Sequence, residues 1–122
     1  MAKILIVDDS ADITEIVASR LEANNYDVAI AESGEEALEM VKPENPDLIL
    51  LDISMPGIDG IETGRRLKAD EETKAIPIVM ITAKGDQNDI MLAIKEAQAV
   101  DYIVKPFRSD QLLEKIQRAL AS

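Results

Sequence analysis

The stretch Leu48-Ile49-Leu50-Leu51-Asp52 sets four apolar residues in a row and ends them with an acid. Such a continuous apolar run predicts a central strand of a parallel sheet, buried on both faces. A charged carboxylate at the end of a buried strand is costly to desolvate, so this one calls for a specific role. Three other predicted strands also end in polar side chains: Asp8 and Asp9 after 3–7, Thr82 after 76–81, and Lys105 after 102–104.

If these strands run parallel in one sheet, their five polar side chains meet at one edge of it. Three carboxylates, one hydroxyl and one ammonium group would then share a small pocket. Hard divalent cations prefer oxygen ligands, and a cation beside a lysine can neutralise a phosphoryl group. The strand ends therefore predict a site for a divalent cation and a phosphoryl group.

Helical patterns alternate with these strands and with a further strand at about 27–31. The first helix, at about 11–23, should face the core with Ile13, Ile16, Val17 and Leu21, and Asn24-Asn25 should end it. Five strands alternating with five helices predict a doubly wound α/β fold with a five-stranded parallel sheet. Ligands of such folds bind beyond the carboxyl ends of the strands, where the polar side chains are predicted to gather.

Capping signals give the other helix boundaries. Ser33 and Glu36 form a capping box for a second helix, which Pro43 is predicted to stop. Asp59 and Glu62 begin a third, which runs to about 69, and a fourth covers about 86–97. Ser109 is predicted to cap the last helix, whose core-facing residues are Leu112, Leu113, Ile116 and Leu120.

Composition excludes several classes of function. The 122 residues suit one domain, and their net charge of −11 argues against direct binding of nucleic acid. Cysteine and histidine are absent, which excludes thiolate chemistry, a Ser-His-Asp triad and metal sites with either ligand. No apolar run approaches the ~20 residues of a membrane span, and no signal peptide pattern is present. These features fit a cytoplasmic protein.

A nucleotide is the common ligand of doubly wound sheets, but the glycines argue against one here. Glycine occurs at positions 34, 57, 60, 64 and 85, which builds neither G-x-G-x-x-G nor G-x-x-x-x-G-K-[ST]. The first strand-to-helix turn, Asp8-Asp9-Ser10-Ala11-Asp12, is acidic and would repel a pyrophosphate without a metal.

From Ile4 to Leu120 the chain resembles the receiver domain of bacterial two-component response regulators. The resemblance rests on ILIVDD at 4–9, on Asp52 with Met55-Pro56-Gly57 and Asp59-Gly60, on Thr82-Ala83, and on YIVKPF at 102–107. One such motif alone would be weak evidence, but all of them occur in order at matching strand ends. The resemblance implies a single receiver domain over 1–122, like a single-domain chemotaxis regulator. It also implies a flavodoxin-like (βα)5 sheet with strand order 2-1-3-4-5.

In that family, the aspartate that matches Asp52 accepts a phosphoryl group from a histidine kinase or a histidine phosphotransfer protein. The resemblance assigns Asp8 and Asp9 to Mg²⁺ binding, with Mn²⁺ as an alternative ion. Asp52 and the backbone carbonyl of Ser54 would complete the set of metal ligands. The chain has no histidine to phosphorylate, so the donor must be another protein or a small phosphodonor. We expect no conventional turnover, only self-phosphorylation from a donor and slow autodephosphorylation.

The resemblance also implies roles in switching. Thr82 would bond a phosphoryl oxygen, Lys105 would pair with it as a cation, and a cis peptide would join Lys105 to Pro106. Tyr102 matches the aromatic residue that turns inward on phosphorylation, while Ser54 and Lys84 would tune the lifetime of the acyl phosphate. Many family members have glycine in place of Gln98. Because a left-handed non-glycine residue costs roughly 1–2 kcal/mol, we expect the fourth helix to end differently here.

The signal would leave through the fourth helix, the fifth strand and the fifth helix. Residues 90–94, IMLAI, are apolar at consecutive positions, so some of them must face solvent or a partner. A downstream protein target, or a second copy in a phosphorylation-dependent dimer, would bind this face.

Two simpler interpretations remain at this stage. A lone Asp8 or Asp9 would be an ordinary helix cap. The chain could also be a small Mg²⁺-dependent phosphohydrolase of the haloacid dehalogenase type, which uses an aspartyl nucleophile. Those enzymes place it in Asp-x-Asp after the first strand, which Asp8-Asp9-Ser10 does not match.

Overall fold

A computed structural model describes residues 1–83 and 87–121. Its five parallel strands lie in the order β2-β1-β3-β4-β5, as predicted. The strands are β1 (Lys3–Val7), β2 (Asp27–Ala31), β3 (Leu48–Asp52), β4 (Ile78–Ala83) and β5 (Asp101–Lys105). The helices are α1 (Ala11–Ala23), α2 (Gly34–Glu44), α3 (Gly60–Ala69), α4 (Gln87–Glu96) and α5 (Ser109–Ala121).

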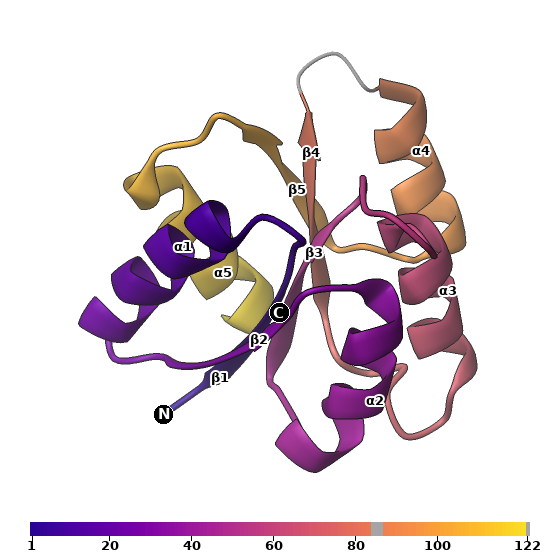
Figure 1. Cartoon of the computed structure of the whole chain (residues 1–122), viewed down its shortest axis with the longest axis horizontal. Coiled ribbons are helices and arrows are strands. Elements are labelled where there is room, and N and C mark those ends of the chain that lie inside the picture. The colour runs from indigo at the N-terminus through magenta and orange to yellow at the C-terminus, as the bar shows by residue number, and fades with distance from the viewer. Residues whose placement is uncertain (84–86, 122) are drawn as a thin grey trace.

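The helices cover both faces of the sheet. Figure 1 views the sheet nearly edge-on, with α1 and α5 on one side and α2, α3 and α4 on the other. Each layer has its own apolar core, because alternate residues of the central strands point to opposite faces. All of β1 beyond Lys3 and all of β3 are buried, which explains their continuous apolar sequences.

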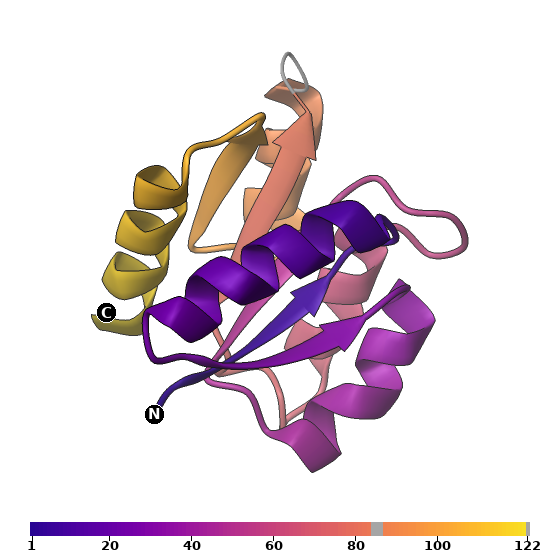
Figure 2. The same ribbon diagram turned by 60° about the vertical axis from the view of Figure 1, so that its left-hand side comes forward.

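The strand register brings the polar strand ends level with one another. Val7 pairs with Leu51, so Asp8 and Asp52 follow on neighbouring strands. Asp52 pairs with Ile81, and Ala83 pairs with Lys105. The parallel arrows in Figure 2 end at this common edge of the sheet. The fold therefore gathers at one edge the residues that the sequence placed at separate strand ends.

Several local predictions need correction. Ile16 does not face the core but is 62% exposed, and the buried face of α1 uses Thr14 and Ala18 instead. Pro43 lies inside α2, which ends one residue later, at Glu44. Ser109 is already within α5 rather than its cap, because the Leu112 amide bonds to the carbonyl of Arg108.

The end of α4 also differs from expectation. Gln98 has a φ of 53°, so the chain leaves α4 through a left-handed residue although no glycine is present. The amide of the next residue, Ala99, bonds back to the carbonyl of Ala93 at 3.2 Å. This bond and the burial of Ala97 and Ala99 hold the turn against the local backbone cost.

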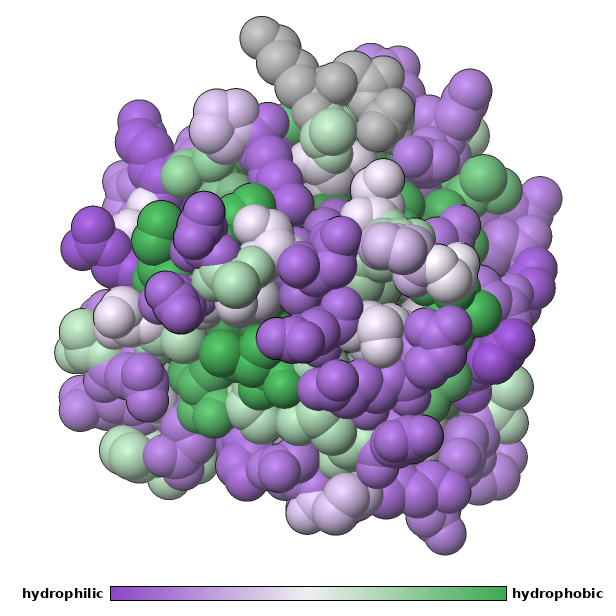
Figure 3. All heavy atoms as spheres, viewed as in Figure 1, coloured by the Kyte–Doolittle hydropathy of each residue, from purple (hydrophilic) through white to green (hydrophobic). Residues whose placement is uncertain are grey.

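Within residues 1–83 and 87–121, no helix is both long and apolar enough to cross a bilayer. Hydrophilic residues cover most of the face in Figure 3, and hydrophobic residues appear between them in several separate patches.

Candidate functional site

Three carboxylates converge at the carboxyl edge of the sheet. Asp8 and Asp52 are 1% and 5% exposed, because each directly follows or ends a buried strand. Asp9 is exposed at the rim of the same cluster. One carboxylate oxygen from each of these three residues lies within 4.8 Å of the other two. This is the predicted acidic site, assembled from residues 44 positions apart in the chain.

Lys105 at the end of β5 bridges the two buried acids. Its Nζ lies 3.3 Å from Asp8 Oδ2 and 3.2 Å from Asp52 Oδ2. The other oxygen of each acid accepts a backbone hydrogen bond, from the Ser10 amide to Asp8 and from the Ser54 amide to Asp52. Each buried carboxylate is therefore fixed on one side by its own loop and on the other by the lysine.

The acid pair is not an ordinary helix cap. The N-cap residue of α1 is Ser10, whose own side chain makes no capping hydrogen bond. Asp8 instead bonds the amide of Ser10, two residues further on, and turns its second oxygen toward Lys105. The structure thus favours a shared acidic site over the capping interpretation of Asp8 and Asp9.

Burial and like charges both act on Asp52. Burial is the larger cause that raises its pKa, from 3.8 to about 6, and the carboxylate of Asp8 raises it further. Lys105 and the Ser54 amide act in the opposite direction without cancelling these effects. Burial by itself would lower the pKa of Lys105, but Asp52 and Asp8 outweigh it and raise that pKa. The site therefore holds more negative charge than its one lysine neutralises.

The donor atoms of this site fit a hard divalent cation. All of its side-chain ligands are carboxylate oxygens, which Mg²⁺ and Mn²⁺ accept and which the softer transition metals favour less. Three acids offer few protein ligands, so water would complete the octahedral shell of Mg²⁺. The excess of negative charge at Asp52 is a second reason why a cation suits this position.

The remaining predicted site residues come from β4, from β5 and from the loop after β3. Thr82 is buried in β4, one residue beyond the partner of Asp52, and its hydroxyl lies 3.4 Å from the carbonyl of Ala83. Tyr102 is half-buried on β5, with Lys115 Nζ 5.4 Å from its ring centre. Ser54 is exposed next to Asp52. Lys84 lies outside the described residues. The Lys105-Pro106 peptide bond is cis, as the resemblance implied.

Sequence reasoning missed one residue near the site. Glu35, in the first turn of α2, accepts a hydrogen bond from the Ile58 amide in the loop that follows Asp52. The two residues are 23 positions apart, and Glu35 otherwise matches a common pattern of acids at helix N-termini.

The chain resembles known proteins over nearly its whole length. The family described as the response regulator receiver domain matches residues 4–117. The chain is 45% identical to the phosphate regulon transcriptional regulatory protein PhoB of Pseudomonas aeruginosa, over 96% of this chain and 51% of that protein. It is 41% identical to the DNA-binding response regulator MtrA of Mycobacterium tuberculosis, over 97% of this chain and 50% of that protein. The chain therefore spans about half the length of these curated relatives.

A solved structure extends the comparison to the fold. The chemotaxis protein CheY4 of Vibrio cholerae matches with a TM-score of 0.92 and 34% identity, over 98% of each chain.

Proposed function

The chain belongs to the family of response regulator receiver domains, and on this premise we propose that Asp52 is its phosphoacceptor. The observation that carries the proposal is the setting of this carboxylate. It is nearly buried, yet it opens onto an edge where Lys105 and two further acids surround it. An ordinary structural acid would not need so costly a position.

The transfer itself requires little chemistry from the protein beyond position and charge. An oxygen of Asp52 attacks the phosphorus of a phosphohistidine on a kinase or phosphotransfer protein. The new P–O bond forms as the P–N bond breaks, and its electron pair leaves with the imidazole of the donor. Lys105, already 3.2 Å from Asp52 Oδ2, would balance charge on the incoming phosphoryl group. Thr82 would donate its hydroxyl to a phosphoryl oxygen.

A divalent cation belongs in this proposal because the negative charge of three acids exceeds the positive charge of one lysine. Asp8, Asp9 and Asp52, with the backbone carbonyl of Ser54, would hold Mg²⁺ or Mn²⁺. When bound, the ion would offset the charge that accumulates between the acids and the phosphoryl oxygens. Family membership favours this receiver chemistry over a phosphohydrolase, whose nucleophile would follow β1 rather than end β3.

Phosphorylation would then change the face formed by α4, β5 and α5. We propose that Thr82 moves toward the phosphoryl group and that Tyr102 turns inward behind it. The exposed apolar residues of α4 would give this face an apolar surface for binding a protein target or a second copy. Ser54 and Lys84 would tune how long the acyl phosphate survives.

The wider setting is also a proposal. Residues 1–122 would act as one receiver domain in the cytoplasm. The net charge of −11 argues against direct contact between this domain and nucleic acid, although relatives such as MtrA are described as DNA-binding.

The deciding experiment measures phosphorylation of the intact chain. Incubation with Mg²⁺ and phosphoramidate should add one phosphoryl group, detected by intact mass, and Asp52→Ala should lose it. Asp110→Ala is a suitable control, because Asp110 is an exposed acid in the first turn of α5. Full labelling of Asp52→Ala would place the acceptor elsewhere and refute the proposal.

A further inference from the structure

The loop between β3 and α3, residues 53–59, is closed tightly at the phosphoacceptor. At its neck, the Gly60 amide donates to the carbonyl of Ile53 at 2.8 Å. A Cβ on Gly60 would lie 2.2 Å from the backbone oxygen of Asp52, so only glycine fits there. The two ends of the loop are therefore pressed together directly behind the acceptor carboxylate.

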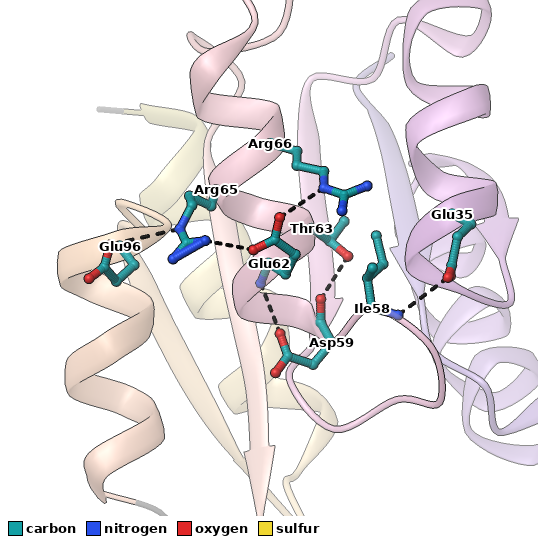
Figure 4. A network of polar contacts seen from close by, with 8 residues as sticks. All are labelled: Glu35, Ile58, Asp59, Glu62, Thr63, Arg65, Arg66 and Glu96. Atoms are coloured by element: carbon teal, nitrogen blue, oxygen red, sulfur yellow. Dashed lines mark hydrogen bonds and ion pairs between the residues drawn. The ribbon is translucent and has the colours of Figure 1, made fainter.

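The tip of the same loop rests on α2, as Figure 4 shows. The Ile58 amide donates to Glu35 Oε2 at 3.3 Å. A Cβ on Gly57, whose φ is +77°, would come within 2.6 Å of this oxygen. Gly34, the residue before Glu35, lies against the side chains of Ile58 and Thr63. The first turn of α2 thus holds the loop by one hydrogen bond and by close packing.

The start of the loop acts on the acceptor itself. The Ser54 amide donates to Asp52 Oδ1 at 3.2 Å, while Lys105 holds Oδ2. A shift of the loop would therefore separate Asp52 Oδ1 from the Ser54 amide. Because the neck is closed and the tip is held, the position of Ser54 depends on both attachments.

We propose that Glu35 is a positioning residue for phosphoryl transfer, which acts through the 53–59 loop on the orientation of Asp52. The inference rests on the proposed function, since it takes Asp52 as the acceptor. Glu35 does not touch the site. Its carboxylate fixes the Ile58 amide, the loop carries that constraint to Ser54, and Ser54 orients the oxygen of Asp52 that Lys105 leaves free.

A simpler role for Glu35 must be separated from this one. An acid in the first turn of a helix stabilises that helix through its dipole, whatever its contacts. Glu35→Gln distinguishes the two roles, because glutamine keeps an oxygen that can accept from the Ile58 amide but loses the charge. Glu39→Ala serves as the matched control, since Glu39 is an exposed acid one turn further along α2.

The experiment combines two measurements on the full chain. Amide hydrogen exchange of Ile58 and Ser54 is followed without phosphodonor, and the rate of Asp52 labelling is followed with phosphoramidate and Mg²⁺. Loss of one net hydrogen bond should speed both exchanges and slow labelling by roughly 3-fold to 10-fold in Glu35→Ala. Glu35→Gln should restore most of both properties, and Glu39→Ala should change neither.

Three results would overturn the inference. Faster exchange at Ile58 with unchanged Ser54 exchange and labelling would make Glu35 a loop anchor only. Equal behaviour of Glu35→Gln and Glu35→Ala would assign it to the helix dipole. Unchanged exchange in Glu35→Ala would remove the contact altogether. If the unsubstituted chain is not labelled on Asp52, the proposed function fails instead, and the exchange data still report on the loop.

Discussion

The carboxyl edge of the sheet and the outer face of α4 are opposite exceptions to the usual separation of polar and apolar residues. At the edge, Asp8 and Asp52 are 1% and 5% exposed. On α4, Met91, Leu92 and Ile94 are 69%, 44% and 51% exposed, while Ala93 between them is buried. Green side chains accordingly interrupt the hydrophilic surface along α4 at the right of Figure 3.

The two exceptions differ in what they do to stability. A buried charge is unfavourable in the folded state, so the acidic edge weakens the fold until a cation or a proton neutralises it. An exposed apolar side chain costs little, because the unfolded chain exposes it as well. Under the proposed function, the edge would respond to a change of charge, and the exposed face of α4 would bind a partner. Substitutions should separate the two regions by the size of their effect on stability.

The largest effect is expected for Asp52→Asn. In the folded protein Asp52 keeps its proton up to about pH 6, but in the unfolded chain it loses the proton near 3.8. The folded state therefore binds more protons between these values, and stability falls as pH rises through them. The difference between these two pKa values corresponds to a loss of about 3 kcal/mol in the free energy of unfolding above pH 6.

Urea denaturation at several pH values checks this expectation. Asp52→Asn should exceed the unsubstituted protein in stability by up to about 3 kcal/mol at pH 7.5, and the difference should vanish near pH 4. Glu39→Gln, an exposed control, should show no such dependence. A difference in stability that does not change with pH would mean that the surroundings of Asp52 do not raise its pKa.

The next effect concerns Lys105→Met, which keeps the length of the side chain and removes its charge. Both buried acids lose their cation, so the pKa of Asp52 should rise further above about 6. Labelling by phosphoramidate should slow by roughly tenfold to a hundredfold. Lys115→Met is the control, since Lys115 has the same 28% exposure and pairs with Asp101 away from the acids.

Amide spectra give a second measurement for Lys105. Phosphorylation should shift many resonances of the unsubstituted protein, and Lys105→Met should reduce that shift. A full shift in the variant would show that the lysine is not needed as a cation in the phosphorylated state.

A smaller effect is expected from Asp9→Ala, because Asp9 is the exposed member of the acidic site. Its removal should weaken Mg²⁺ binding by about tenfold and slow labelling with it. Calorimetric titration of the apo protein measures the affinity directly. Asp12→Ala is the control, since Asp12 is an exposed acid in the first turn of α1. Equal Mg²⁺ affinity in both variants would remove Asp9 from the metal site.

Two properties of parallel sheets made the fold and the acidic site predictable from the sequence. Buried parallel strands have continuous apolar sequences, and in such a fold their carboxyl ends meet at one edge. The grouping of Asp8, Asp52 and Lys105 follows from these two rules, although the residues are far apart in the chain. The raised pKa of Asp52 was also foreseeable, because this acid ends a buried strand and a second acid, Asp8, lies beside it.

The features that escaped prediction depend on contacts between elements. Ile16 fits the apolar pattern of α1, but only the packed helix shows that it points outward. Gln98 adopts a left-handed φ because buried neighbours hold the turn, which a local rule cannot anticipate. The bond between Glu35 and the Ile58 amide exists only once α2 lies beside the 53–59 loop. Periodicity describes one element at a time, so such contacts lie beyond it.

The smallest effect on stability should come from the face of α4. Replacing Met91 and Leu92 together with glutamine changes two exposed side chains, so the free energy of unfolding should stay within about 0.5 kcal/mol of the original value. Phosphoryl uptake should also be unchanged, because neither residue belongs to the acidic site. What should weaken is binding of a protein target, or self-association of the phosphorylated chain, measured by sedimentation.

Two controls make this expectation specific. Ile16→Gln alters an exposed apolar residue on α1, across the sheet from α4, and should leave association intact. Ala93→Gln puts a polar group at the buried position between Leu92 and Ile94 and should destabilise the fold by more than about 1 kcal/mol. If association survives the loss of Met91 and Leu92, the exposed face of α4 is not the surface on which the signal leaves. The two exceptions would then have different origins, and only the buried acids would have a function.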